Sequence, residues 1–326
     1  MDFLEIVKNF EKVNALIIGD FILDKYIWGS VSRISPEAPV PIVKVESIEY
    51  RPGGAGNVAL NMRALGCNVM CIGLAGHDEN SKILKKLFDR AGIKTKIFRD
   101  KRITTVKTRV IAHKQQVVRI DEEEVRYVED KIQNDIIKFI KDISGGHDVA
   151  VISDYAKGLM APELTKEIIS MLRGKVPVVI DPKGDNYNKY TGATIIKPNF
   201  NEFKWAVSKL DLTINDIKKF STSLIDKYEL DGLVVTLGEN GVFIQKKDGE
   251  YKRIPTRAKE VYDVSGAGDT FIGTFSAVFA ITGDCFISGE IANLASGIVV
   301  GKIGTATVNQ FELMNEMKNG ALKDVT

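Results

Sequence analysis

The sequence predicts an α/β protein whose main element is a doubly wound, mostly parallel β-sheet. Short runs rich in β-branched residues alternate with helical stretches, which is typical of a parallel sheet covered by helices on both faces. Two longer segments break this alternation and indicate a separate, smaller β-structure. The buried runs that follow the first strand are 69–73, 149–153, 176–181, 194–197 and 232–236.

The first strand is predicted at Asn14–Gly19, after helical periodicity over residues 2–12. Polar residues directly follow several of the predicted strands. Open parallel sheets bind ligands beyond the carboxyl ends of their strands, so these side chains are candidates for one common site. They are Asp20, Asp154, Asp181 and Asn199.

The segments Phe21–Tyr50 and Thr104–Asp121 do not have the pattern of crossover helices. Four prolines lie from position 36 to position 52, and the second segment alternates apolar and polar residues like an exposed antiparallel pair. A hairpin without function is the alternative. Charged and amide side chains in both segments argue against it. They are Arg33, Lys44, Arg109, Gln115 and Arg119.

The composition is that of an ordinary globular protein. The 326 residues could form one large domain or two smaller ones. Lys and Arg number 45 against 43 Asp and Glu, and a net charge of +2 argues against nucleic-acid and membrane partners. Three scattered histidines argue against a His-based zinc site.

The cysteines and the N-terminus favour a cytoplasmic protein. Cys67, Cys71 and Cys285 are odd in number, and the first two have the spacing of inward-facing positions along an apolar strand rather than of metal ligands. The N-terminus lacks the basic and apolar regions of a signal peptide. No apolar run is long enough for a membrane span.

A glycine-rich loop over 263–271 is the strongest functional signal. Small residues at 265–268 allow several amides to converge on one anion, and the apolar run Phe271–Ile281 predicts a buried helix whose N-terminus adds positive charge. Asp269 lies inside this loop, where we expect nearby amides to hold it ionised as a proton acceptor. An anion cradle with a base indicates phosphoryl transfer to an alcohol. The alternative is a glycine-rich connection whose Asp caps a helix.

A second glycine motif, RPGGAGNVA at 51–59, contains a GxGxxA string. A dinucleotide-binding turn needs a strand that runs straight into the first glycine, but here Arg-Pro precedes it, some thirty residues after the first strand. The dinucleotide interpretation therefore fails. A simpler role for Asn57 is that of a helix N-cap.

The two glycine motifs resemble the N-terminal and C-terminal signatures of the ribokinase-like (PfkB) sugar kinases, in the same order, and the resemblance extends from Gly19 to Thr307. It implies a single kinase domain over 1–326, with a β-sheet lid built from insertions near 21–50 and 104–121. It also implies Asp269 as catalytic base. The anion hole would comprise Gly266, Ala267 and Gly268.

The same resemblance implies ATP and Mg²⁺ as cofactors and, in several relatives, a monovalent cation such as K⁺. Sugar contacts would come from Asp24, Gly53, Gly54 and Asn57, and the nucleotide-side contacts from two further motifs. The first is NxxE, with Asn199 and Glu202 between phosphates and hydrated magnesium. The second is TxGxxG, a hairpin turn in its simpler interpretation, with Thr236, Gly238 and Gly241. Asn293 would lie near adenosine, and Asp263 with Ser265 at the monovalent cation.

A finer resemblance, over 32–41, 115–121, 153–158 and 181–184, is to the D-glycero-β-D-manno-heptose 7-phosphate kinases of lipopolysaccharide precursor synthesis, in their stand-alone form. One departure is Lys197, where relatives more often carry a small polar residue. A substrate phosphate must meet arginine or lysine. We expect at least two of five cations to contact it: Arg33, Arg51, Arg109, Arg119 and Lys157.

The predicted function is ATP-dependent phosphorylation of the anomeric hydroxyl of heptose 7-phosphate. Another ribokinase-like kinase, acting on a different sugar or sugar phosphate, is the alternative within the class. A non-catalytic sugar or nucleotide sensor is the alternative from another class, and the glycine cradle with Asp269 argues against it. We expect a homodimer through the lid, because an exposed lid edge would otherwise stay unpaired.

Overall fold

The computed structural model describes residues 2–113, 115–258, 261–302 and 304–321. A nine-stranded sheet forms the centre of the molecule, and its strands β12 and β13 are antiparallel to the rest. In spatial order the strands are β13 (Tyr251–Ile254), β12 (Val242–Lys246), β11 (Gly232–Thr236), β10 (Ile195–Ile196), β9 (Val178–Asp181), β8 (Val149–Ser153), β1 (Asn14–Gly19), β4 (Asn68–Ala75) and β5 (Lys94–Arg99).

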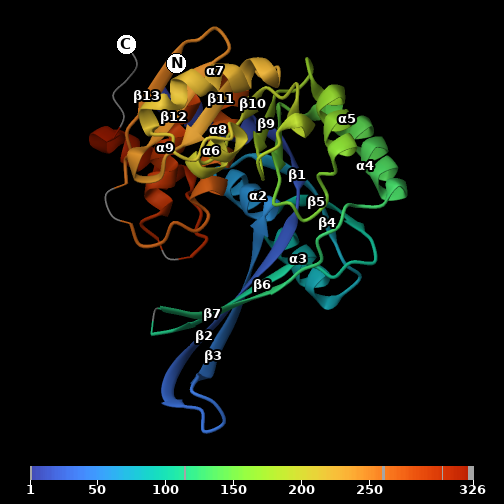
Figure 1. The fold of residues 1–326 in the computed structure, drawn as a ribbon, viewed down its shortest axis with the longest axis vertical. Helices are drawn as coiled ribbons and strands as arrows, with labels where there is room; N and C mark the ends of the chain where they lie inside the picture. The colour runs from blue at the N-terminus through green and yellow to red at the C-terminus, as the bar shows by residue number, and fades with distance from the viewer. Residues whose placement is uncertain (1, 114, 259–260, 303, 322–326) are drawn as a thin grey trace.

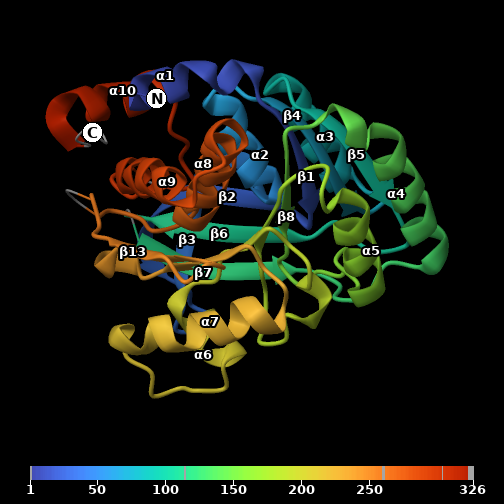
Figure 2. The ribbon, with the colours of Figure 1, turned by 90° about the horizontal axis from the view of Figure 1, so that it is seen from above.

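Both faces of this sheet are covered, as the continuous apolar strands require. Along β1, Ala15 and Ile17 pack into one core, and Leu16 and Ile18 into the other. Figure 2 shows α2, α8 and α9 on one side of the sheet and α6 and α7 on the other. The helices are α1 (Phe3–Lys8), α2 (Ala55–Ala64), α3 (Glu79–Arg90), α4 (Asp130–Ile143), α5 (Pro162–Leu172), α6 (Phe200–Ala206), α7 (Ile217–Lys227), α8 (Ala267–Thr282), α9 (Cys285–Val299) and α10 (Gln310–Glu316).

A four-stranded sheet extends away from this body (Figure 1). Its outer strands pair antiparallel with their neighbours, whereas its two central strands, β2 and β6, are parallel. We call it the lid sheet. In spatial order it comprises β3 (Pro41–Gly54), β2 (Phe21–Ile34), β6 (Val106–Ala112) and β7 (Gln115–Glu122).

The prediction of a doubly wound sheet with a smaller separate sheet is confirmed. Three predicted strands have the expected bounds, namely β1, β8 and β11, whereas β10 is only two residues long. The predicted helix over 2–12 is an α-helix that tightens into a 3₁₀ turn at Asn9–Lys12. Cys71 lies inside β4 and Cys67 just before it, and both are buried and free. Within the described part of the chain, no helix has the length and apolar character needed to cross a membrane.

Candidate active site

A cavity of about 1050 Å³ opens at the carboxyl ends of β8, β9, β10 and β11. It forms there because each of these strands ends in a loop at the same edge of the sheet. The sequence-predicted residues that line it are Asp154, Asp181, Asn199, Glu202, Thr236, Gly238, Gly241, Gly266, Ala267, Gly268, Asp269 and Asn293.

Asp269 lies in the first turn of α8 and is 6% exposed. It does not cap the helix, since Gly266 occupies the N-cap position. Both carboxylate oxygens accept hydrogen bonds from neutral side chains instead. Asn57 Nδ2 donates to Oδ2 at 2.7 Å, and the Tyr155 hydroxyl donates to Oδ1 at 2.8 Å. The interpretation of this loop as a helix-capping connection is therefore wrong.

The pKa of Asp269 is raised to about 7, mainly because the carboxylate is buried, and the nearby Asp181 carboxylate raises it further. The hydrogen bonds from Asn57 and Tyr155 and the charge of Lys197 oppose this rise. The expectation that loop amides hold the group ionised is thus wrong, because burial outweighs the donors. A carboxylate with a pKa near neutrality is suited to accept a proton from a substrate hydroxyl.

The loop before α8 supplies amide donors at the cavity wall. Gly266 has φ +80°, a left-handed conformation that favours glycine. The Ala267 amide donates to the Val264 carbonyl at 3.2 Å, so it is occupied in this structure. Within the described residues, the amides of Gly268 and Asp269 have no hydrogen-bond partner. These two amides, at the helix N-terminus, are available to an anion.

Two lysines also line the cavity. Lys197 is buried and pairs with Asp181 at 3.0 Å, and Lys183 pairs with Glu202 at 3.0 Å. Asn199 and Glu202 form a reciprocal capping box at the start of α6. Cations close to free amides are suited to bind polyphosphate. Lys197 Nζ lies 3.9 Å from the position that a Cβ on Gly268 would take, so the departure at Lys197 adds a positive charge near the Gly268 amide.

The donors around Glu202 fit a hydrated magnesium ion better than a dehydrated metal. In the part of the chain that the structure describes, no group of three or more His, Cys, Asp and Glu residues could hold a metal by itself. Mg²⁺ keeps several waters and is usually held by one or two carboxylates together with substrate phosphates. Glu202 with Asn199 satisfies that requirement at the cavity wall.

The TxGxxG segment is the turn between β11 and β12, and it also lines the cavity, so its two interpretations are compatible. Gly241 has φ +85°. Asn293 donates from Nδ2 to the Pro255 carbonyl at 2.7 Å. Sequence reasoning missed the apolar side chains beside them. Val261 and Val264 line the cavity and are 63% and 69% exposed.

The lid sheet presents one charged face, because alternate residues of a strand point to the same side. The strand register places Asp24 opposite both Arg51 and Lys107, and Tyr26 opposite Arg109. Asp24 is buried and forms an ion pair with Arg109. Other members of this face are Glu49, Arg119 and Asp121.

Tyr26 is the residue on this face that sequence reasoning missed. The guanidinium carbon of Arg51 lies 5.2 Å from the centroid of its ring, and that of Arg109 lies 5.4 Å away. The ring is 3% exposed, and its buried hydroxyl has no hydrogen-bond partner in the described structure. Two guanidinium groups against one aromatic ring bring two positive charges together, which is suited to an anion.

The other predicted residues are not among those that line the cavity. Asn57 is not a helix N-cap, because Gly54, with φ +58°, starts α2. A Cβ at Gly53 would collide with the Asp24 carboxylate. Asp263 accepts from the amides of Ser265 and Gly304, at 2.8 and 3.0 Å.

The remaining candidate cations are already engaged or lie apart. Lys157 pairs with Glu123 at 2.8 Å, and Arg119 pairs with Asp121 at 3.0 Å. Arg51 pairs with Glu49 at 2.7 Å. Arg33 is exposed near the end of β2, at the tip of the lid sheet.

The fold and this cavity together define a kinase of the carbohydrate class. Residues 14–311 match the model of the pfkB family carbohydrate kinases, and the chain belongs to this family. The prediction of a sugar kinase is therefore confirmed.

Among particular proteins, the chain is 41% identical over 309 residues to the bifunctional protein HldE of Geotalea uraniireducens, covering 94% of this chain and 63% of that protein. It is 42% identical over 311 residues to the bifunctional protein HldE of Geobacter metallireducens, with the same coverage. The chain thus spans less than two thirds of the length of these relatives.

Solved structures show the same fold at low identity. Phosphofructokinase-2 from Escherichia coli, in complex with potassium, superimposes with a TM-score of 0.79 at 17% identity, over 93% of this chain and 97% of that one. Ribokinase from Arabidopsis thaliana, complexed with ribose and ATP, gives 0.72 at 16% identity, over 94% and 99%.

We predict that Asp269→Asn lowers kcat by about 10²-fold or more while ATP still binds, because the amide keeps the shape but cannot accept the proton. Steady-state kinetics and ATP titration of the folded variant would check this. Near-normal turnover would exclude Asp269 as the base.

The raised pKa also predicts a pH-dependent stability. The folded protein binds a proton at Asp269 more tightly than the unfolded chain does, so the associated stabilisation is complete below about pH 4 and is lost as pH rises through about 7. Between pH 5 and pH 8 the free energy of unfolding of the wild type should fall relative to Asp269→Asn by on the order of 2 kcal/mol. Denaturant melts at both pH values measure it, and parallel curves would contradict the assignment.

Gly268→Val tests the amide cradle. A Cβ at Gly268 would meet only Lys197 Nζ, at 3.9 Å, so the side chain fits the fold but projects into the cavity. We expect kcat to fall at least tenfold with little change in Tm, since a branched side chain obstructs the approach of a phosphate. Unchanged kcat with unchanged Tm would mean that phosphate does not lie against this loop.

Proposed function

We propose that the protein transfers the γ-phosphoryl group of ATP to the anomeric hydroxyl of D-glycero-D-manno-heptose 7-phosphate, giving the 1,7-bisphosphate. The observation that carries the proposal is the position of Asp269. This buried carboxylate has a pKa of about 7 and lines the nucleotide-sized cavity, beside Asn57 from the helix that follows the lid strand β3. The relatives named HldE support the choice of a heptose phosphate.

Asp269 would act as the general base. It takes the proton of the sugar hydroxyl as that oxygen attacks the γ-phosphorus, the bond to ADP breaks, and the proton is later released to water. The amides of Gly268 and Asp269 and the ammonium of Lys197 would stabilise the negative charge of the transferring group. Magnesium, held by Glu202 and Asn199 through water, would neutralise phosphate charge.

The adenosine end of the cavity has an apolar wall. Val261 and Val264 leave most of their surface uncovered while lining the cavity, and a stacked base would bury that surface. Asn293 and the TxGxxG turn, with Thr236, Gly238 and Gly241, would contact the same nucleotide. Asp263 and Ser265 would hold K⁺ where a monovalent ion is used.

The charged face of the lid sheet would bind the substrate phosphate. Arg51 and Arg109 flank Tyr26, and a phosphate of roughly −2 charge could take hydrogen bonds from both guanidinium groups and from the unsatisfied hydroxyl. Asp24, Gly53 and Asn57 would contact the sugar between this phosphate and Asp269. Arg51 and Arg109 also pair with carboxylates, those of Glu49 and Asp24, but both lie against Tyr26. They are therefore the cations that carry the proposal.

The opposite face of the lid sheet supports a homodimer. Its side chains Ile48, Val118 and Ile120 are each about half exposed, at 49%, 46% and 51%. A second lid packed against them would cover this apolar surface. We place the reaction in the cytoplasm, which agrees with three free, buried cysteines.

A comparison of two sugars tests the substrate assignment. Arg51→Gln should raise KM for heptose 7-phosphate by about tenfold or more, because a charge-assisted hydrogen bond to phosphate is lost. The KM for ATP should stay unchanged. The matched control is Lys25→Gln, which alters a cation on the opposite face of β2.

The wild type should also use unphosphorylated heptose much less well than heptose 7-phosphate. ADP release with both sugars provides the measurement. Equal use of both sugars would reject the phosphate assignment and favour another member of the kinase class, whereas no turnover with any sugar would favour the sensor alternative.

A further inference from the structure

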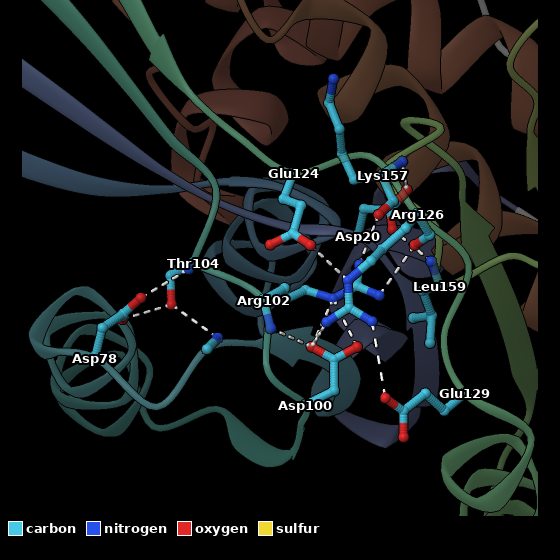
Figure 3. Close-up of polar contacts among 11 residues, drawn as sticks. Asp20, Asp78, Asp100, Arg102, Thr104, Glu124, Arg126, Glu129, Lys157 and Leu159 are labelled. Carbon is cyan, nitrogen blue, oxygen red and sulfur yellow. Dashed lines mark hydrogen bonds and ion pairs between the residues drawn. The ribbon is translucent and has the colours of Figure 1, made fainter.

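The loop that follows β8, residues 154–159, donates three backbone amides to the carboxylate of Asp20. Figure 3 shows Lys157 and Leu159 beside this carboxylate. Asp20 is 2% exposed and follows β1 directly. Its Oδ2 accepts from the amides of Tyr155 and Lys157, at 3.0 and 2.9 Å, and its Oδ1 accepts from the amide of Leu159 at 3.1 Å. Burial and the Asp154 carboxylate raise the pKa of Asp20, and the three amide hydrogen bonds oppose the rise. One side chain therefore holds three alternate backbone amides of this loop.

The backbone of the loop is strained. Ala156 has φ +55°, a left-handed conformation that costs a residue with a Cβ roughly 1 kcal/mol. Gly158 has φ +103°, and a Cβ there would collide with the Arg126 carbonyl. Strain of this kind persists only where surrounding contacts enforce it.

A buried ion pair, that of Arg102 with Asp100, also contacts this loop. Arg102 donates from Nη1 to the Lys157 carbonyl at 2.7 Å and from Nη2 to the Arg126 carbonyl at 3.0 Å, while its Nε binds Asp100 at 2.8 Å (Figure 3). Both partners of the pair are buried. Because desolvation offsets much of the attraction in such pairs, its main effect is to define the loop conformation.

Together, these contacts fix the position of the Tyr155 hydroxyl. Tyr155 is the first residue whose amide Asp20 binds, and its side chain reaches Asp269 Oδ1 at 2.8 Å. Burial and the neighbouring carboxylates raise the pKa of Tyr155, so the hydroxyl keeps its proton and can only donate to Asp269. It is one of two hydrogen-bond donors to the proposed base.

We propose that Tyr155 and Asp20 are positioning residues for phosphoryl transfer: Asp20 holds the 154–159 loop so that the Tyr155 hydroxyl stays on Asp269 Oδ1, and Tyr155 in turn orients the base. This hydrogen bond favours the ionised base and leaves a defined lone pair of the carboxylate directed at the substrate hydroxyl. The proposal rests on Asp269 acting as the base and does not depend on which sugar is used.

Three other groups face Asp269 and set its proton affinity together with Tyr155. Asn57, from α2, donates to its second oxygen. Asp181, from the end of β9, opposes ionisation, and Lys197, after β10, favours it. The substitutions below leave all three unchanged, so a shift in the pH profile reports on the Tyr155 contact.

The test is a double-mutant cycle on Tyr155→Phe and Asp20→Asn, read from kcat as a function of pH. Without the hydroxyl, the ionised base loses a hydrogen bond, so the acid limb of the pH–rate profile should move up by about one pH unit. On the acid side of that limb kcat should then fall about tenfold. Asp20→Asn should move this limb in the same direction. The side-chain NH2 of asparagine would face at least one of the three backbone N–H donors and cannot accept its hydrogen bond. KM for ATP should be unchanged in both.

The double variant should be no slower than the slower single variant, since Asp20 acts through Tyr155. If kcat of the double variant fell by the product of the two single effects, about 100-fold, the proposal would be overturned. An Asp20→Asn variant with a lower Tm but an unshifted acid limb would overturn it as well. Asp78→Asn is the matched control. Asp78 also accepts from backbone amides, those of Ser81 and Thr104, but it does not contact the 154–159 loop (Figure 3).

The control should lose stability and keep the wild-type pH profile. The cycle also separates this inference from the proposed function. If Asp269→Asn retains activity, the role of Asp269 as base fails; if Asp269→Asn is inactive but the cycle is additive, only the role of Asp20 and Tyr155 fails.

Discussion

The burial of one carboxylate, that of Asp269, is the constraint on which the rest of the site depends. A charge removed from water must be compensated by neighbouring dipoles or ions, or it binds a proton. Its compensating groups come from distant parts of the chain: Asn57 is 212 residues away in sequence and Tyr155 is 114. The carboxylate can therefore reach its working state only after the sheet, α2 and α8 have assembled. Local sequence alone cannot build this base.

The two sheets contribute different parts of the proposed binding site. The parallel strands end at one edge and supply the wall of the cavity, with Lys197 and Asp181 at successive strand ends. The lid sheet separates polar from apolar side chains by simple alternation, so that Tyr26 and Arg109 share the charged face while Ile48 and Ile120 lie on the other. A one-residue shift in register would exchange these faces, and the pairing of β2 with β3 is unbroken from Phe21 to Trp28, before the first bulge.

Much of the fold and part of the site could be predicted from sequence, because their signals are local. Strand ends such as Asp181 and the glycine loop before Asp269 follow from periodicity and from the chemistry of helix N-termini. The protonation of Asp269 could not be predicted, since it depends on burial by segments remote in sequence. The simpler interpretation of Asn57 as a helix N-cap is wrong because Gly54, with φ +58°, occupies that position, and nothing in the sequence marks it as the cap. The contact of Tyr155 with Asp269 was missed for the same reason: it is purely tertiary.

The four acidic residues near this edge of the sheet show why Asp269 is the suitable base. Asp154 accepts from the ammonium of Lys189 and the hydroxyl of Tyr190, and Asp181 is paired with Lys197. Asp20 is bound by three amides and is not among the residues that line the cavity. Asp269 alone of the four combines access to the cavity with hydrogen bonds from neutral groups only. A cation would stabilise its ionised form too strongly for it to accept a proton, whereas two neutral donors orient it and leave its proton affinity near neutrality.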